Sequence, residues 1–314
     1  MATATTPSFS LNNGRTIPAI GVGCWMGAPG GADDVREMVE YALKIGYRHI
    51  DTAFAYQNEE YVGQAIRNSG IPRDQIYLVT KLHDVHHGSV QEGLDLSLKQ
   101  LGVDYIDLYL MHWPQARDPV TSRILRPDEH PTFVETWKEM EKLLESGKVK
   151  SIGVSNFSVK TLEILLPQAK VIPAVNQIEM HPLLPQLDVL DYCRKKNILV
   201  TAYTPLGRGH PDLMEHPVLK EIRTRLGGTS VQVVMGWFVK KGVVAIPKSA
   251  NQTRLKENLA YVSISSEDEA KIDAIHKEPG KHRSMIGYHQ PDGTVFGWSY
   301  EQLGWPFKKD GVVS

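Results

Sequence analysis

Three apolar stretches decide the fold of this chain: HIDTAFAY (residues 49–56), IYLVTKL (76–82) and IDLYLMHW (106–113). Each is typical of a β-strand. At or near the ends of these strands lie Asp51, Tyr56, Lys81 and His112. Lys81 follows Asp51 by 30 residues (81 − 51), and His112 follows Lys81 by 31 (112 − 81), the length of one strand and one helix. In a barrel of parallel strands the C-terminal strand ends converge on one mouth. We therefore expect these ionisable groups to meet in space.

Helical patterns alternate with the apolar stretches. Their apolar residues recur at three-to-four spacing opposite charged faces, which suits helices that cover a barrel from outside. Eight such segments are residues 33–46, 58–70, 90–102, 132–147, 159–169, 187–197, 231–242 and 253–262, and two extra helices are expected at 218–227 and 265–277. The strands are almost wholly apolar, as in a parallel sheet with both faces buried. The sequence predicts an α/β fold, a (β/α)8 TIM barrel.

The remaining segments complete this prediction. Residues 8–25 begin with two short strands around Asn13-Gly14, a dipeptide suited to hairpin turns, and we expect this N-terminal β-hairpin to plug the bottom of the barrel. Segments 114–131, 208–228 and 279–314 are long, so we expect loops over the mouth. The C-terminal segment, about 279–314, is rich in aromatic residues and glycine and forms either a mobile substrate wall or a packed cap. One domain, residues 1–314, is expected.

The composition narrows the function. Lys plus Arg total 35 against 36 Asp plus Glu, so no basic excess is available to bind nucleic acid. The N-terminus lacks the pattern of a signal peptide, and no apolar run approaches the ~18 residues of a membrane span. We expect a cytoplasmic protein with no membrane partner. The cysteines, Cys24 and Cys193, have no metal-ligand spacing, and Cys24 is expected to be a buried structural thiol.

Several long motifs, in order, resemble the aldo-keto reductase family, in particular its fungal- or plant-like members. They are GYRHIDTAFAYQNEEYVGQAI (46–66), LVTKL (78–82), LYLMHWP (108–114), KVKSIGVSNFS (148–158), AVNQIEMHP (174–182), TAYTPLG (201–207) and AIPKSANQTRLKEN (245–258). The resemblance covers nearly the whole chain. It implies a monomer that reduces small aldehydes and ketones to alcohols with NADPH.

The four strand-end residues suit this chemistry. A carbonyl that receives a hydride needs an acid near its oxygen, and Tyr56 can supply one. An unperturbed phenol has a pKa near ~10, so we expect the Lys81 ammonium to lower it and Asp51 to keep Lys81 charged. His112 would orient the substrate oxygen. The resemblance implies the same catalytic roles, while the plainer alternative is a structural Asp51–Lys81 ion pair beside two half-buried polar rings.

A cofactor must supply the hydride, because no side chain here can. GVGCWMG (21–27) lacks the third glycine of the dinucleotide fingerprint, so a Rossmann domain is not indicated. IPKSANQTRLKEN (246–258) instead leads from the eighth strand into a helix N-terminus, where Lys248, Ser249, Arg254 and backbone N–H groups suit a phosphate. Two cations favour NADPH over NADH.

The resemblance assigns the other site residues. It places Lys248, Ser249, Arg254, Glu257 and Asn258 on the 2′-phosphate and adenine of NADPH, Ser155, Asn156 and Gln177 on the nicotinamide carboxamide, and Tyr203 on the nicotinamide ring. Gly23, Cys24, Trp25, Asp51, Thr204 and Leu206 complete the expected cofactor site. The expected substrate pocket consists of Trp25, Ala55, Tyr56, His83, His112 and Trp113.

The chain departs from the family pattern in two places. His83 stands where relatives commonly have tryptophan, so we expect a more polar pocket wall there. Asp84, His86 and His87 follow it without metal-ligand spacing; we interpret them as solvated loop residues and predict no metal. The loop beginning at Arg208 is short, so a full clamp over the cofactor is not expected.

Two other functions stay open. Lys81 at a strand end also suits a Schiff-base barrel aldolase, which borohydride would trap on substrate. A non-catalytic NADPH-binding regulatory protein is the other alternative, although the intact set of four polar residues favours an enzyme.

Overall fold

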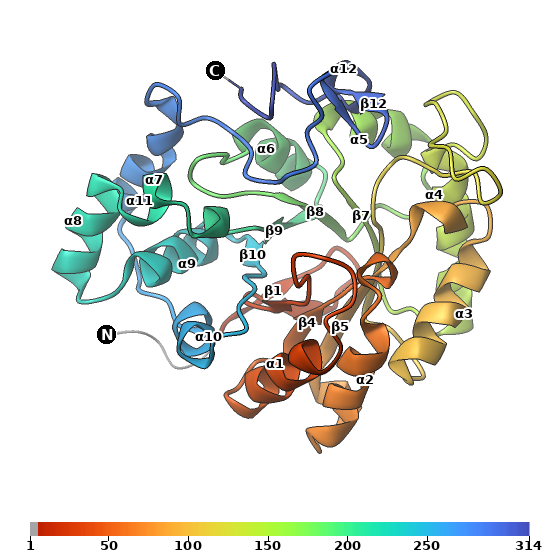
Figure 1. The fold of residues 1–314 in the computed structure, drawn as a ribbon, viewed down its shortest axis with the longest axis horizontal. Helices are drawn as coiled ribbons and strands as arrows, with labels where there is room; N and C mark the ends of the chain where they lie inside the picture. The colour runs from red at the N-terminus through yellow and green to blue at the C-terminus, as the bar shows by residue number, and fades with distance from the viewer. Residues whose placement is uncertain (1–5, 314) are drawn as a thin grey trace.

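Eight parallel strands form a closed barrel in the computed structural model, which describes residues 6–313 (Figure 1). The strands pair in chain order: β3 (Val22–Gly23), β4 (His49–Asp51), β5 (Tyr77–Leu82), β6 (Leu108–Met111), β7 (Ile152–Ser155), β8 (Val175–Glu179), β9 (Leu199–Tyr203) and β10 (Val244–Ala245). A parallel bridge between Ile20 and Ala245 joins the first strand to the last. The backbone N–H of Gly21 donates to the Ala245 carbonyl at 2.9 Å, which closes the barrel. The predicted (β/α)8 barrel is confirmed.

Helices cover the outside of the barrel. The eight that follow the strands are α1 (Ala32–Lys44), α2 (Glu59–Asn68), α3 (Val90–Leu101), α4 (Phe133–Leu143), α5 (Val159–Leu165), α6 (Leu187–Lys195), α9 (Ser230–Lys241) and α10 (Gln252–Leu259). The two predicted extra helices are α8 (Pro217–Leu226) and α11 (Ser266–Asp273). The last barrel helix is shorter than expected, since Ala260 is already extended. No helix within residues 6–313 is long and apolar enough to cross a membrane.

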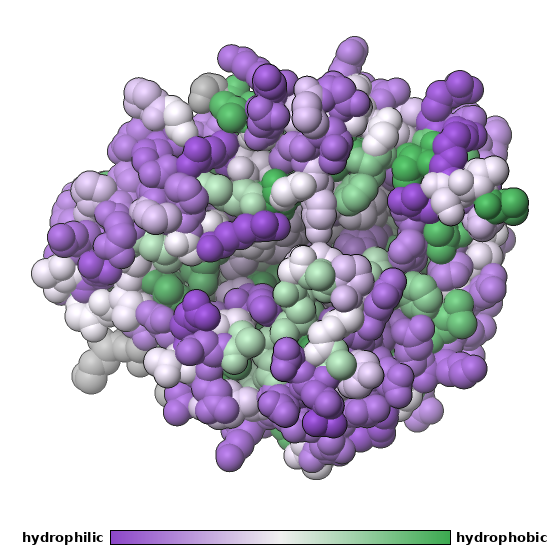
Figure 2. Space-filling model, in the orientation of Figure 1, coloured by the Kyte–Doolittle hydropathy of each residue, from purple (hydrophilic) through white to green (hydrophobic). Residues whose placement is uncertain are grey.

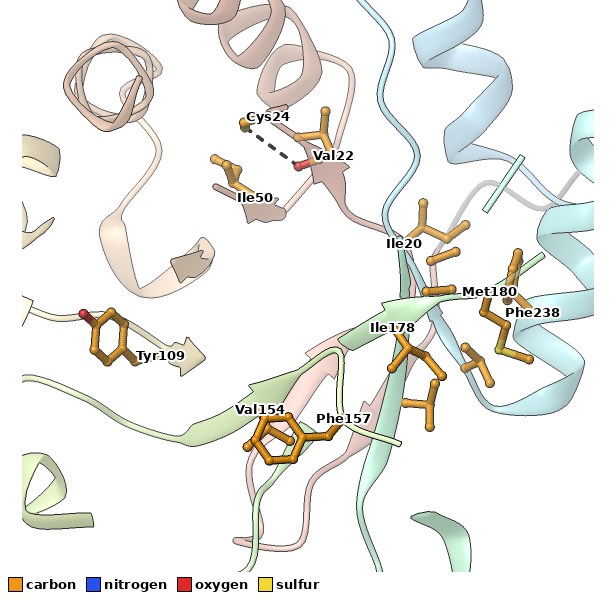
Figure 3. Packing of buried hydrophobic residues seen from close by; sticks show 14 of the residues in the cluster. Ile20, Val22, Cys24, Ile50, Tyr109, Val154, Phe157, Ile178, Met180 and Phe238 are labelled. Carbon is orange, nitrogen blue, oxygen red and sulfur yellow. Dashed lines mark hydrogen bonds between the residues drawn. The ribbon is translucent and has the colours of Figure 1, made fainter. Parts of the chain in front are cut away.

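The outer core lies between the strands and these helices. Figure 3 shows part of it, with Val22, Ile50, Tyr109 and Ile178 among the buried side chains. Cys24 belongs to this cluster, and its Sγ lies 4.0 Å from the Val22 carbonyl oxygen. Burial raises the pKa of the Cys24 thiol, so the thiol stays protonated. The expectation of a buried structural cysteine is confirmed.

The inner core fills the bottom of the barrel and packs against the N-terminal hairpin, which consists of β1 (Ser8–Ser10) and β2 (Thr16–Pro18). Leu11 and Ile17 of this hairpin pack against Val79, Val175 and other inward side chains of the strands. Side chains alternate along a strand, so the next inward positions after Val79 and Val175 are Lys81 and Gln177. The interior is therefore apolar at the bottom and polar toward the mouth.

The C-terminal tail packs across one side of the mouth. It contains a two-stranded sheet, β11 (Thr294–Val295) with β12 (Trp298–Ser299), and the short helix α12 (Tyr300–Leu303). The hydroxyl of Ser158, which caps α5, donates to the Leu303 carbonyl at 2.7 Å, and Trp298 donates its indole N–H to the Leu125 carbonyl at 2.7 Å. In Figure 1 the blue tail lies beside α5 and α6.

Candidate active site

A cleft of about 1060 Å³ opens at the C-terminal end of the barrel. Figure 2 shows it as a hollow near the centre of the face, rimmed by hydrophilic side chains. The strand ends form its floor, and its walls come from the loop after β6, the loop after β9 and the C-terminal tail. The three long segments predicted to lie over the mouth therefore all contribute to this cleft.

An ion pair lies beneath the floor of the cleft. Lys81 Nζ donates to Asp51 Oδ1 at 2.5 Å and to the Thr52 carbonyl at 2.7 Å, and the Lys81 side chain is fully buried. Gln177 donates from its amide to Asp51 Oδ2 at 2.7 Å. Each carboxylate oxygen of Asp51 therefore has a donor, which satisfies this buried charge.

Tyr56 projects over this pair. Its strand ends earlier than expected, at Asp51, and Tyr56 lies on a 3-10 turn, Phe54–Tyr56. Asn58 fixes that turn: its amide donates to the Cys24 carbonyl, and its oxygen accepts from the Thr52 hydroxyl, both at 2.9 Å. The phenol oxygen accepts a hydrogen bond from Lys81 Nζ at 3.5 Å. The turn therefore holds the phenol between the buried ammonium and the open cleft.

The pKa of Tyr56 differs from the expectation. We expected Lys81 to lower it, but burial, followed by the charge of Asp51, raises the pKa of Tyr56 well above its ordinary value. The ammonium lies closer to Asp51 than to the phenol, so its effect is largely neutralised. Burial and the Lys81 charge hold the pKa of His112 well below its ordinary range. At neutral pH the site therefore presents a protonated phenol and a neutral imidazole.

Polar groups line the next strand ends. The Tyr203 hydroxyl donates to Asn156 Oδ1 at 2.8 Å, the Asn156 amide donates to the His112 carbonyl at 2.9 Å, and Ser155 Oγ donates to the Gln177 carbonyl at 2.8 Å. Asn156 has a left-handed backbone, with φ of 66°. This network fixes the Tyr203 ring at the cleft wall and links it to the strand that carries His112.

The far end of the cleft is basic. Lys248 and Arg254 line it and make no ion pair with any residue of 6–313. Burial and the neighbouring Arg254 lower the pKa of Lys248. The side chain of Asn251 caps α10 by accepting from the Arg254 N–H at 3.0 Å. These two unpaired cations beside a helix N-terminus are the observation that fits a dinucleotide phosphate here.

The cleft gathers the residues that the sequence singled out. It is lined by Gly23, Cys24, Trp25, Asp51, Ala55, Tyr56, His83, His112, Trp113, Ser155, Asn156, Gln177, Tyr203, Thr204, Leu206, Lys248, Ser249, Arg254, Glu257 and Asn258. Lys81 lies under the floor. The Cys24 side chain also belongs to the outer core.

Sequence reasoning missed several lining residues, among them Gln115, Arg117, Arg208, Ile286, Tyr288 and Phe296. All lie in the three long segments predicted to form loops over the mouth. Their position was therefore the only signal, because irregular loops have no periodicity that identifies which side chains face inward.

The turn after β5 corrects one interpretation. His87 is not solvated: it is 1% exposed, and burial lowers its pKa to about 4. Asp84 is also largely covered; its Oδ2 accepts from Arg117 Nε at 2.9 Å, and its Oδ1 lies 2.6 Å from Nδ1 of His83. The loop is short and folds back against the barrel, which buries these groups. Within residues 6–313, no group of three metal-ligating side chains is suited to hold an ion.

Comparison with known proteins places this geometry in context. A glycerol 2-dehydrogenase (NADP(+)) of Saccharomyces cerevisiae is 43% identical over 294 residues, 88% of this chain and 93% of the relative. A D-galacturonate reductase of Hypocrea jecorina is 40% identical over 309 residues, 93% and 97% of the two chains. A Bombyx mori aldo-keto reductase solved in complex with NADP matches with a TM-score of 0.82 and 34% identity, covering 90% of this chain and 95% of that one. The sequence profile of the Aldo/keto reductase family matches residues 19–277, and this chain belongs to that family.

Proposed function

We propose that this protein is an NADPH-dependent oxidoreductase that reduces small aldehydes and ketones to alcohols. The observation that carries the proposal is the position of Tyr56, whose protonated phenol faces the cleft 3.5 Å from the buried Lys81 ammonium. Family membership and the solved relatives that contain NADP or NADPH support the same chemistry.

Four side chains have different roles in the proposed proton transfer. The bound cofactor supplies the hydride. Tyr56 donates its proton to the substrate oxygen as that oxygen becomes negative, and Lys81 stabilises the phenolate that is left. Neutral His112, whose ring lies 5.7 Å from the Tyr56 ring, donates an N–H to the same oxygen and orients it. Asp51 holds Lys81 in place through their buried ion pair.

The cofactor site follows from the charges at the other end of the cleft. Lys248 and Arg254 would bind the 2′-phosphate that distinguishes NADPH from NADH. The Tyr203 ring, held by Asn156, offers an aromatic face for the nicotinamide, and the polar strand ends offer partners for its carboxamide.

The substrate class follows from the wall around His83. His83, Asp84 and Arg117 make part of the cleft lining polar, whereas Trp25, Trp113 and Phe296 contribute large apolar rings. Relatives named for glycerol and for galacturonate support a preference for carbonyl compounds that carry neighbouring hydroxyl groups.

The geometry counts against an aldolase. A Schiff base forms on a free amine, but Lys81 is fully buried and its Nζ donates to Asp51 and Thr52. Borohydride treatment with an aldehyde should therefore leave Lys81 unmodified, as mass spectrometry of the peptide that contains Lys81 would show.

Tyr56→Phe tests the proposed reaction directly. The variant should lose about 10²-fold or more of kcat, the usual contribution of a positioned acid, while NADPH binding, followed by fluorescence, stays unchanged. Tyr61→Phe removes a neighbouring phenol that does not line the cleft and should keep full activity. Near-normal turnover by the Tyr56 variant would contradict the assignment of the acid.

A further inference from the structure

Glu179 is a buried carboxylate that the proposed reaction does not use. It ends β8, two residues beyond Gln177, and only 4% of it is exposed. Its Oε1 accepts from His181 Nε2 at 3.0 Å and from the Met285 backbone N–H at 2.6 Å, and its Oε2 accepts from the Ser284 hydroxyl at 2.5 Å. Two of these three donors come from the C-terminal tail, more than a hundred residues along the chain.

These donors replace the water that the carboxylate loses. Burial alone would raise the pKa of Glu179, but the hydrogen bond and charge of His181, followed by the hydrogen bonds from Ser284 and Met285, outweigh burial and hold the pKa below its ordinary value. Within residues 6–313 no lysine or arginine lies within 4.0 Å of this carboxylate. A buried charge is costly when a partner is removed, so the tail segment and Glu179 depend on each other.

The anchored segment leads directly to the cleft. Ser284 Oγ also accepts from the Ile286 N–H at 3.2 Å, and Ile286 and Tyr288 line the cleft. The Tyr288 ring lies 6.1 Å from Trp113 and 5.1 Å from Phe296, and Phe296 lies 4.8 Å from Trp113. We call the rings of Trp113, Tyr288 and Phe296 the aromatic wall. Trp113 directly follows His112, so this wall reaches the reacting end of the cleft.

We propose that Glu179 is a positioning residue that latches residues 284–288 to the barrel and thereby fixes the aromatic wall against the substrate. The proposal rests on the reductase function above. A substrate with a large apolar group needs the wall in place, whereas a three-carbon substrate ends before reaching it. Glu179 therefore sets the affinity for bulky carbonyl compounds and leaves the reaction of the smallest ones unchanged.

Steady-state kinetics of Glu179→Gln with NADPH test the effect on substrate. With 4-nitrobenzaldehyde, KM should rise about tenfold, the usual loss for one hydrogen bond to a charged group, while kcat stays within about twofold. With D-glyceraldehyde, both constants should stay within about twofold. Ser284→Ala removes the same contact from the tail side and should change KM in the same direction. The double variant should be no worse than the poorer single variant, because both lose one contact.

Asp268→Asn is the matched control. Asp268 is also a buried carboxylate, 2% exposed and bonded to Arg225 and Ser265, but it lies on α11, away from the cleft. This variant should destabilise the protein without changing the ratio of the two KM values. Equal KM increases for both aldehydes in Glu179→Gln would overturn the role in substrate selection.

Hydrogen exchange tests the latch without any turnover. In Glu179→Gln, the backbone amides of residues 284–290 should exchange at least about tenfold faster, with strands β4 to β8 unchanged. Unchanged exchange in this segment would overturn the latch even if the enzyme is active. If the native protein oxidises no NADPH with either aldehyde, the proposed function fails, and the exchange result still decides whether Glu179 anchors the tail.

Discussion

His83 is the residue that the sequence predicts to make the pocket wall more polar, and its surroundings show how its ring is held. Nδ1 lies 2.6 Å from Asp84 Oδ1 and 3.2 Å from the Val85 backbone nitrogen, so this nitrogen faces the protein. Nε2 has no hydrogen-bond partner among the described residues. The imidazole is held from one side and lines the cleft, so Nε2 is the nitrogen left for a substrate hydroxyl.

A substitution at this position should therefore change substrate preference. We predict that His83→Trp shifts kcat/KM from hydroxylated aldehydes toward hydrophobic ones by roughly 1–3 kcal/mol, the effect of one hydrogen bond to substrate. The ratio of kcat/KM for D-glyceraldehyde and hexanal measures this shift. His86→Phe changes a neighbouring ring that does not line the cleft and should leave the ratio unchanged. A constant ratio in His83→Trp would place specificity in the 114–131 loop and the tail instead.

His87 gives a prediction for stability against pH. Burial lowers its pKa to about 4 from an unfolded value of 6.5. Between these values the unfolded chain binds a proton that the folded chain does not, so the free energy of unfolding rises with pH. The contribution is present above the unfolded pKa and is lost as pH falls through the folded one.

Within residues 6–313 neither ring nitrogen of His87 has a hydrogen-bond partner, so an apolar replacement removes no such bond. We predict that His87→Leu reduces the loss of unfolding free energy between pH 7 and pH 5 by roughly 2 kcal/mol. Urea unfolding at the two pH values measures the difference. Some slope should remain, since His49 is also buried with a pKa lowered to about 4. An unchanged difference would mean that His87 titrates normally.

At the scale of elements, the sequence predicted the strands and helices whose apolar residues follow a regular pattern of burial. The strand ends at Lys81 and His112 and the amphipathic helices carry such patterns and form where expected, although the last barrel helix ends at Leu259 rather than at Val262. The four-residue helices, Pro211–Met214 and Tyr300–Leu303, are too short for a periodic signal, and so is the pairing of Thr294–Val295 with Trp298–Ser299. The site lining was predictable only at strand ends, because loop side chains such as Tyr288 face inward through tertiary packing.

Arg254 on α10 leads to a prediction about the relative affinities for NADPH and NADH. Arg254→Ala should weaken NADPH binding about tenfold to a hundredfold and NADH binding much less, because only NADPH has a 2′-phosphate for the guanidinium to bind. Fluorescence titration with both cofactors measures this difference. Lys256→Ala removes an exposed cation two residues later that does not line the cleft, and it should change neither affinity. Equal losses for NADPH and NADH in Arg254→Ala would show that the arginine has a structural role only.

At the scale of the whole molecule, the barrel separates stability from function along its axis. The hairpin and the apolar inner core occupy the bottom, and the polar layer with the cleft occupies the C-terminal end. Leu11 and Ile17 of the hairpin do not line the cleft, so changes in the hairpin should alter cofactor binding little.

The core residue Ile17 tests this separation. It is fully buried beneath the barrel, so Ile17→Ala should lower the free energy of unfolding by about 2–4 kcal/mol. NADPH at a hundredfold excess over its Kd should raise that free energy by about 2.7 kcal/mol in the native protein. Because Ile17 does not line the cofactor site, the same increase within about 0.5 kcal/mol is expected in the variant. Urea unfolding of both proteins, with and without NADPH, measures the increase in unfolding free energy that NADPH causes in each. A difference between the two increases of more than about 0.5 kcal/mol would mean that the hairpin supports the cofactor site through the barrel rather than only sealing its base.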